Sequence, residues 1–287
     1  MKQYVVSSFV SKLGGGNKAA VILDDKNLNK QQMQNIAKIN NFSETAFINI
    51  EKSDKENYSI RYFTPTEEVD ICGHAALASF HLLDVLGYIV SSEIYHKTKA
   101  GRLKVIKNGD IFLTQMKPPE IVGYSSIDDI IEITDLKKEE IIPNKEGRIS
   151  IVSTGLKDAI IEVVSLKVLE EMSINKEKMA TYCRAKNIIG AHVVSRETIE
   201  KDSDFACRNF APAVGIDEES ATGTSNASLI YYIMLEGKEE IKSTPYKIEQ
   251  GYFMDSPSNI YVYAFEKEKY EIFVGGKAII LETKDVY

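Results

Sequence analysis

Three short sequence patterns occur twice in this 287-residue chain, in the same order and 139 to 150 residues apart. A K-x-A-x-I pattern lies in one predicted strand of each half, and an R-x-F-x-P pattern ends another. A glycine then opens a helix rich in small residues. Because each match is short, the indication of a duplicated half comes from their shared order and spacing. The pairs are residues 18–22 with 157–161, 61–65 with 208–212, and 72–75 with 222–225.

The third pattern opens a helix in each half. Residues 70–83 read DICGHAALASFHLL, with alanines on one face and larger apolar residues at helical spacing. Gly73 and His74 fall in its first turn, where unpaired N–H groups and the helix dipole favour an anion. Alone, this stretch is equally well a buried helix that begins at a glycine. Residues 221–235 form a second such helix, and two like halves could turn both N-termini toward one cleft for a small carboxylate.

The apolar pattern predicts an α+β protein with many short strands. Pro118 and Pro119 interrupt this pattern, and we place a domain boundary there because proline cannot donate in a sheet or continue a helix. The charged segment 125–144 is expected to form short solvated helices. The strands nearest the candidate sites are predicted at residues 18–23, 42–50, 58–63, 89–96, 158–164, 189–194, 203–210 and 243–250.

Composition narrows the class of partner. The net charge of −7, with a pI near 5.3 and no basic block, argues against a nucleic-acid partner. No stretch approaches the roughly 18–20 apolar residues of a membrane helix, and the N-terminus is too polar for a signal peptide. Three cysteines without a C-x-x-C pair suit a reducing compartment. We therefore expect a cytoplasmic protein that acts on a small molecule, without a membrane partner.

Several side chains are candidates for acid–base chemistry. Glu44 lies among apolar and hydroxyl residues, where a carboxylate can have a raised pKa and act as a general base. His74 can move a proton, and Glu219 precedes the second helix. Each also has a plainer interpretation. Glu44 could lie on an exposed strand face, His74 could be a packing histidine, and Glu219 could be an acid that favours the helix dipole. Cys72 could be an activated thiolate, but Thr222 takes the matching place, which disfavours a racemase that uses a pair of cysteines.

Metal binding is not expected. His81, His96 and His192 have no metal-ligand spacing with one another or with the cysteines. The sequence therefore predicts no metal site.

Seven blocks of sequence carry a family resemblance. They are GNKAAVIL (16–23), FSETAFI (42–48), DICGHAALASFHLL (70–83), STGLKDAIIEV (153–163), DEESATGTSNASLIYYI (217–233), EQGYFMDSPSNIYV (249–262) and FVGGKAII (273–280). Together they resemble the PhzF family of phenazine-biosynthesis-like isomerases, which share the diaminopimelate epimerase fold. The resemblance implies two pseudo-symmetric halves, each a central helix wrapped by a mostly antiparallel sheet, with the active site between them. It implies that the last strands return to the first half, so the halves are residues 1–118 with 276–287, and residues 119–275.

The resemblance also implies roles for single residues. Glu44 matches the family's catalytic glutamate, which moves a proton between substrate carbons without a cofactor, and His74 matches its active-site histidine. Glu219, which we expect to be catalytic, stands where the family usually has aspartate, and Thr224 where it has serine. The family's arginine is replaced by Ser256, so a substrate group that it would contact is in doubt. The positions implied to bind substrate are Asn17, Cys72, Gly73, Thr222, Gly223, Thr224 and Gln250.

The sequence thus predicts a cofactor-independent isomerase that shifts a proton on a small carboxylate-bearing substrate, as a homodimer by family resemblance. One alternative is a racemase or epimerase that uses Glu44 with Cys72 or Glu219 on opposite faces of a carbon. Another is a non-catalytic protein that binds a metabolite.

Overall fold

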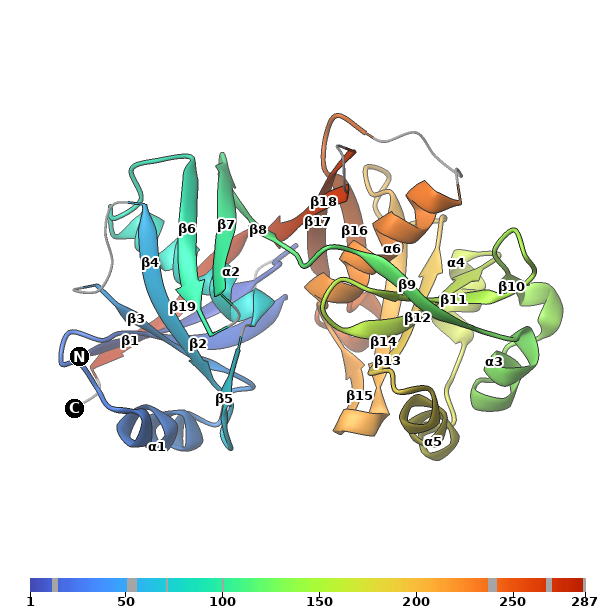
Figure 1. Ribbon diagram of the computed structural model, residues 1–287, viewed down its shortest axis with the longest axis horizontal. Coiled ribbons are helices and arrows are strands. Elements are labelled where there is room, and N and C mark those ends of the chain that lie inside the picture. Colours follow the sequence, from blue (N-terminus) through green and yellow to red (C-terminus); the bar gives the residue numbers. More distant parts are fainter. Residues whose placement is uncertain are drawn as a thin grey trace. The chain divides into compact units, whose positions relative to one another are not determined.

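The computed structural model describes residues 1–11, 15–50, 56–70, 72–99, 101–236, 242–266 and 270–285. The chain forms two compact units, unit 1 (Met1–Gln115 with Gly275–Tyr287) and unit 2 (Met116–Val274) (Figure 1). The domain division predicted at 118/119 and 275/276 stays a prediction, because compactness alone does not show that either unit folds by itself. Within the described residues, no helix has both the length and the apolar character needed to cross a membrane.

Unit 1 is a curved, mostly antiparallel sheet around one helix. The strands follow the order β19, β1, β2, β3, β4, β6, β7 and β8, with parallel pairing for β2–β3 and β4–β6, and with β5 added at the end of β4. Its elements are β1 (Lys2–Ser8), β2 (Asn17–Leu23), α1 (Lys30–Asn40), β3 (Thr45–Asn49), β4 (Asn57–Phe63), β5 (Glu68–Val69), α2 (Gly73–Val85), β6 (Glu93–Thr98), β7 (Gly101–Asn108), β8 (Ile111–Gln115) and β19 (Ala278–Asp285).

Unit 2 repeats this arrangement. Its strands follow the order β9, β11, β12, β13, β14, β16 and β17. The parallel pairs are β12–β13 and β14–β16, which correspond to β2–β3 and β4–β6 of unit 1. Its elements are β9 (Glu120–Ser125), α3 (Ile127–Ile133), η1 (Lys138–Glu140), β10 (Ile141–Ile142), β11 (Ile149–Ser153), β12 (Lys157–Val163), α4 (Leu166–Glu171), α5 (Lys176–Lys186), β13 (Gly190–Ser195), β14 (Phe205–Ala211), η2 (Pro212–Val214), β15 (Ile216–Glu219), α6 (Gly223–Leu235), β16 (Tyr246–Gln250), η3 (Tyr252–Met254) and β17 (Ser258–Glu266); β18 (Tyr270–Gly276) follows.

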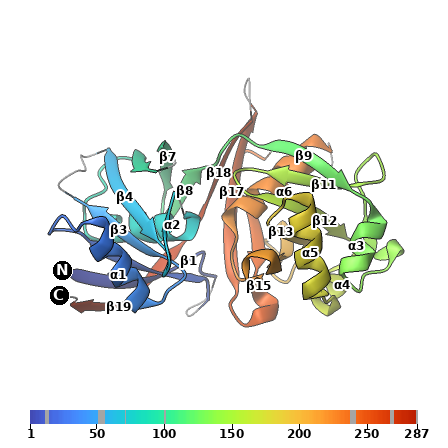
Figure 2. The same ribbon diagram turned by 60° about the horizontal axis from the view of Figure 1, so that its bottom comes forward.

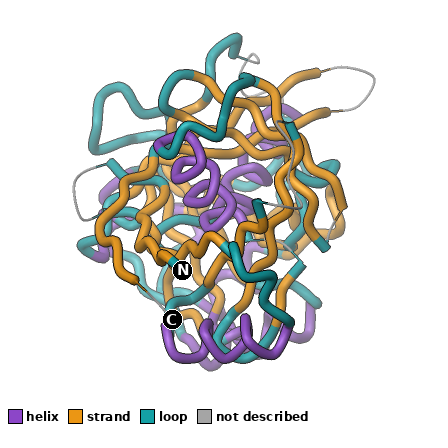
Figure 3. Tube along the Cα trace, turned by 90° about the vertical axis from the view of Figure 1, so that its left-hand side faces the viewer, coloured by secondary structure: helices purple, strands orange, loops and turns teal. Residues whose placement is uncertain are grey.

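The central helices α2 and α6 have buried residues on every face, most of them small or apolar, which is typical of a helix in a protein core. Helix α2 contacts β1, β2, β3, β8 and β19, and Figure 3 shows a helix inside a ring of strands. The other face of each sheet has its own apolar layer. In unit 1 this layer joins α1 to Ile22, Phe47 and Phe63. In unit 2, α3, α4 and α5 cover the sheet (Figure 2). In both halves, apolar residues therefore pack on both faces of the sheet.

The repeat is also present in side-chain contacts. Arg61 Nε donates to Glu68 Oε1 at 2.7 Å, and Arg208 Nε donates to Glu218 Oε1 at 2.9 Å, so each R-x-F-x-P arginine joins the two strands that lead to a central helix. Each arginine also lies over the phenylalanine two residues later. The predicted pseudo-symmetric α+β fold is therefore confirmed.

A second repeated contact fixes the first turn of each central helix. Ser8 Oγ donates to the His74 carbonyl at 2.7 Å, and Thr154 Oγ1 donates to the Thr224 carbonyl at 2.8 Å. His74 and Thr224 are the second residues of α2 and α6. The hydroxyl groups of Ser8 and Thr154 thus orient His74 and Thr224, which we expect to act at the two helix starts.

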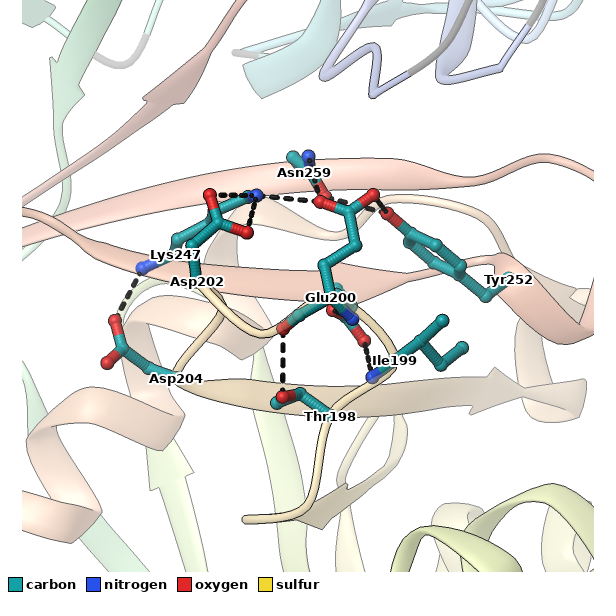
Figure 4. Close-up of polar contacts among 9 residues, drawn as sticks. Thr198, Ile199, Glu200, Asp202, Asp204, Lys247, Tyr252 and Asn259 are labelled. Atoms are coloured by element: carbon teal, nitrogen blue, oxygen red, sulfur yellow. Dashed lines mark hydrogen bonds and ion pairs between the residues drawn. The ribbon is translucent and has the colours of Figure 1, made fainter.

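A polar cluster fixes the segment between β13 and β14 (Figure 4). Lys247 Nζ lies 2.7 Å from Glu200 and 2.8 Å from Asp202. The Tyr252 hydroxyl donates to Glu200 and also contacts Asn259. Because Lys247 and Asn259 belong to β16 and β17, this cluster attaches the segment to the strand that ends at Gln250.

Several local predictions differ from the structure, and one is the strand predicted at 243–250, which begins at Tyr246. The predicted strand 42–50 begins at Thr45, so Glu44 precedes the strand. The strand predicted at 89–96 begins at Glu93. The charged segment 125–144 has one short helix, a 3₁₀ turn and strand β10, because Ile141 and Ile142 pair with β12. Such a short pairing has little signal in a charged segment, because it depends on a strand that is distant in the sequence.

Candidate active site

Three predicted residues of unit 1 meet at the start of α2. Glu44 directly precedes β3, Cys72 is the N-cap of α2, and His74 is the second residue of that helix. His74 Nε2 lies 3.0 Å from Glu44 Oε2. Cys72 Sγ lies 3.5 Å from His74 Nδ1 and 3.8 Å from Nε2. Ser43 Oγ, which the sequence analysis did not single out, is 3.3 Å from His74 Nε2.

The acid of this group is the more accessible member. The Glu44 side chain is 20% exposed, whereas that of His74 is 8% exposed. Although His74 is close, no donor is in hydrogen-bond geometry with the buried Oε2 of Glu44 among the described residues. This oxygen therefore retains acceptor capacity, which is what a general base requires.

Electrostatics make Glu44 and His74 an ion pair. Burial would raise the pKa of Glu44, but its 3.0 Å contact with His74 and the positive charge of that ring lower it overall. Burial would lower the pKa of His74, but its contacts with Cys72 and Glu44 raise it well above the usual value. The sequence had suggested a raised pKa for Glu44 from its apolar neighbours, and the difference arises because His74 lies beside it. Burial raises the pKa of Cys72, which therefore remains a thiol near neutral pH.

The helix start beside this group is open. The N-caps of α1, α3, α4 and α5 each accept a backbone hydrogen bond with their side chains, but Cys72 and Thr222, which precede α2 and α6, do not. The first N–H groups of a helix have no intrahelical partner. A Cβ added at Gly73 would meet nothing within 4 Å. The start of α2 can therefore accept an anionic group of a ligand.

The predicted residues of unit 2 meet at the start of α6. Gln250 is almost fully buried, and its Nε2 donates to the Glu219 carbonyl at 2.7 Å and to Thr222 Oγ1 at 3.0 Å. Its Oε1 accepts from the Thr222 N–H at 3.1 Å and from Asn226 Nδ2 at 2.8 Å. Thr222 Oγ1 in turn donates to Glu219 Oε2 at 3.1 Å. The amide of Gln250 thus positions Thr222 and Glu219, and a contact between Gln250 and a substrate stays a prediction.

The remaining predicted residues lie close to these two groups. Asn17 begins β2 and pairs with Ser8, the residue that fixes the His74 carbonyl. Gly223 and Thr224 are the first two residues of α6. The structure therefore brings the predicted residues together as two groups, one in each unit.

A buried acid below α6 was missed by the sequence analysis. Ser225 Oγ donates to Asp158 Oδ2 at 2.7 Å and accepts from Asn209 Nδ2 at 3.1 Å. Burial, with a smaller effect from the charge of Glu219, raises the pKa of Asp158 to about 6. A signal for this acid was present in the repeat. The second position of K-x-A-x-I is Ala19 in the first copy and the charged Asp158 in the second.

The two groups are not chemically equivalent. The register of β2 with β3 and of β12 with β13 makes Gly190 the counterpart of Glu44. A Cβ at Gly190 would lie 2.0 Å from the Phe210 carbonyl oxygen, so no side chain fits there. At this position of the repeat, unit 1 alone has a base.

Three atoms in unit 1 are also of the kinds that ligate metals. A carboxylate oxygen of Glu44, the sulfur of Cys72 and a ring nitrogen of His74 lie within 4.8 Å of one another. The sequence analysis considered the spacing of His81, His96 and His192 and did not indicate this group. Glu44 is distant from Cys72 and His74 in the sequence and meets them only in the folded chain.

Comparisons with known proteins identify the family of this chain. The profile of the family described as phenazine biosynthesis-like protein (PhzC-PhzF) matches residues 6–284. The chain is 34% identical over 238 residues to an uncharacterized isomerase of Clostridium acetobutylicum, covering 80% of this chain and 78% of the relative. It is 30% identical over 288 residues to the uncharacterized isomerase YfhB of Bacillus subtilis, covering 96% and 95%.

A solved structure shares the fold. The PhzF-family phenazine biosynthesis protein of Bacillus anthracis superposes with a TM-score of 0.88 at 24% identity, over 100% of this chain and 99% of that one. The curated relatives bear isomerase names and align over most of both chains, and this chain is likewise an isomerase. The chain belongs to the PhzC-PhzF family of phenazine biosynthesis-like proteins.

Proposed function

We propose that this isomerase moves a proton between carbons of a small carboxylate-bearing substrate, without a cofactor, and that Glu44 is the base. The supporting observation is the Glu44–His74 ion pair, whose nitrogen and oxygen are 3.0 Å apart beside an uncapped helix start. The lowered pKa keeps Glu44 ionised at neutral pH. Its Oε2 has acceptor capacity for the proton of a substrate carbon.

In the proposed reaction, Glu44 takes a proton from one carbon, the resulting carboxylic acid exchanges its proton with solvent, and Glu44 then delivers a proton to another carbon, so the enzyme is unchanged at the end. The electron pair left on the substrate spreads toward its carboxylate or carbonyl oxygen. The protonated His74 and the free N–H groups at Gly73 and His74 are suited to stabilise this negative charge. Proton transfer by a positioned side chain contributes about 10²–10⁴-fold to a rate.

For unit 2 we propose that Glu219 takes part in the same reaction and that Thr222, Gly223 and Thr224 bind substrate. Support comes from the hydrogen bonds by which Gln250 holds Glu219 and Thr222. Substrate contacts of Asn17 and Cys72 are proposed on their positions at the start of β2 and of α2. Composition suggests a cytoplasmic location, and family resemblance suggests a homodimer, which light scattering of the purified protein would test.

The repeat argues against a symmetric two-base racemase. Gly190 and Thr222 occupy the positions that correspond to Glu44 and Cys72. Neither supplies a second thiol or an acid at those positions. An epimerase that pairs Glu44 with Glu219 is a different case, and the experiment below separates it from an isomerase.

Incubation in heavy water with a panel of aromatic and amino-acid-like carboxylates tests the proposal. An isomerase moves a double bond and places deuterium on a carbon that did not carry the original proton, whereas an epimerase returns deuterium to the same carbon. Hits for the panel come from thermal shift, since a ligand at about 100 times its Kd stabilises a protein by about 2.7 kcal/mol. Ligands that stabilise the protein without any carbon-bound exchange would support metabolite binding alone.

A further inference from the structure

The start of α2 holds three metal-ligand atoms of different kinds in one place. Glu44 Oε2 lies 3.0 Å from His74 Nε2, and Cys72 Sγ lies 3.8 Å from the same nitrogen. Two ligands of a tetrahedral zinc ion, at bond lengths of about 2.0–2.3 Å, are roughly 3.3–3.7 Å apart. These two separations lie within about 0.3 Å of that range, and all three ligand atoms lie within 4.8 Å of one another. Small side-chain rotations would therefore bring the three atoms around one cation.

The charges and the access of the group also suit such an ion. A Glu carboxylate, a Cys thiolate and a neutral imidazole carry two negative charges, which balance a divalent cation in a site that is mostly buried. Glu44 is the most exposed member, so a fourth position can be taken by water from that side. Glu44 Oε2 has no donor in hydrogen-bond geometry and is available as a ligand.

We infer that Glu44, Cys72 and His74 form a binding site for a thiophilic divalent cation of the Zn²⁺ class. The ion would bind Glu44 Oε2, Cys72 Sγ and His74 Nε2, with water as the fourth ligand. On binding, the Cys72 S–H bond breaks, the S–Zn bond forms and the thiol proton leaves to solvent; His74 likewise gives up its second ring proton. Soft sulfur and imidazole ligands favour Zn²⁺ and Co²⁺ over Mg²⁺ and Ca²⁺.

Unit 2 provides an internal comparison. The counterparts of Glu44, Cys72 and His74 are Gly190, Thr222 and Thr224, which supply neither a thiolate nor an imidazole. We therefore expect one such site in the chain. Cys183, which packs in the core of unit 2, provides a matched control for the loss of a cysteine.

The consequence for turnover rests on the proposed function. A bound cation would occupy the lone pair with which Glu44 accepts a proton and would remove the proton from His74. Zn²⁺ would then inhibit the enzyme reversibly, and a chelator would restore it.

Anaerobic titration of the chelator-treated protein with Co²⁺, followed by absorbance, tests the site without a substrate. We expect one Co²⁺ per chain, a thiolate-to-cobalt charge-transfer band, release of protons and displacement by Zn²⁺. Cys72→Ser should abolish the band, and Glu44→Gln should keep it while weakening binding by at least about tenfold. Cys183→Ala should titrate like the parent, and circular dichroism would check that each variant folds.

A missing band in the parent, or a band that survives Cys72→Ser, would overturn the cation site. These outcomes are separable from failure of the proposed function. Cobalt binding through Cys72 with no Glu44-dependent exchange on carbon would contradict only the proposed function. Glu44-dependent exchange without cobalt binding would contradict only the cation site.

Discussion

Glu44 Oε2 lies 3.0 Å from His74 Nε2, in a contact between a residue that ends a loop and one that begins a helix. The Ser8 hydroxyl holds the His74 carbonyl, so the imidazole has a fixed base from which to reach Glu44. The position of the His74 backbone follows from the repeat, because Thr154 holds the Thr224 carbonyl in the same way in unit 2. The chemistry differs between units because Gly190, the counterpart of Glu44, has no side chain.

The ion pair predicts a pH profile for proton exchange on carbon. The pKa of Glu44 is lowered and that of His74 is raised, so both groups are charged through neutral pH. We expect the exchange rate to be flat across neutral pH and to fall as pH rises through the raised pKa of His74. Rates between pH 5 and 10 with a hit from the carboxylate panel would measure this. A rate that falls steadily as pH drops from 7.5 to 6 would contradict it.

The two repeated arginines predict unequal losses of stability. Arg208 is 13% exposed and donates to the carbonyls of Leu169 and Met172 as well as to Glu218, whereas Arg61 is 37% exposed. We expect Arg208→Met to cost about 3 kcal/mol, since buried partners lose their donor, and Arg61→Met about 1 kcal/mol. Urea unfolding of both variants would measure the difference, and equal losses would show that the extra carbonyl contacts contribute little.

Two buried glutamines predict opposite effects of the same substitution. Both polar atoms of the Gln250 amide, Nε2 and Oε1, are hydrogen-bonded. In contrast, neither Nε2 nor Oε1 of the buried Gln3 has a partner among the described residues. Gln250→Leu should destabilise by about 2–4 kcal/mol because several buried groups lose their partners. Gln3→Leu should be neutral or stabilising by about 1–2 kcal/mol. Thermal unfolding would test both, and a large loss for Gln3→Leu would count against this account of its site.

The buried acid in unit 2 predicts a pH dependence of stability. Burial raises the pKa of Asp158 to about 6 in the folded state, above its usual value of 3.8. The folded state therefore binds more protons than the unfolded state between those values, so the contribution of Asp158 becomes less favourable as pH rises from 4 to 6. Asp158→Asn keeps an acceptor for Ser225 and should raise the unfolding free energy at pH 7.5 by about 1–3 kcal/mol. The gain should vanish at pH 4, and a gain of the same size at both pH values would contradict the prediction.

Much of the fold was predictable from the sequence because the repeat, the central helices and the strands carry local signals. The patterns around Arg61 and Arg208 indicated two similar halves, and the glycines that begin α2 and α6 marked the helix starts. The limits of β3 were less predictable. Hydroxyl and apolar residues around Glu44 suit a strand, but the strand begins at Thr45, where pairing with β2 begins.

The sequence indicated candidate residues for the site but not their contacts. Sequence identified Glu44, His74 and Glu219, but neither the contact of Ser43 with His74 nor the saturated hydrogen bonding of Gln250 leaves a local signal. Such contacts depend on segments that meet only in the folded chain. The same reason explains why Asp158 escaped notice, since its proximity to Ser225 joins residues 67 positions apart.

The most direct test of the central claim is deuterium incorporation into carbon by Glu44→Gln. The isosteric amide keeps the shape of the side chain and removes the base. Glu67→Gln, at an exposed acid of the same unit, serves as the matched control. With a substrate from the carboxylate panel in heavy water, we predict that Glu44→Gln slows incorporation by about 10²–10⁴-fold, while the control keeps the parental rate. Incorporation at the parental rate by Glu44→Gln would contradict the assignment of Glu44 as the base.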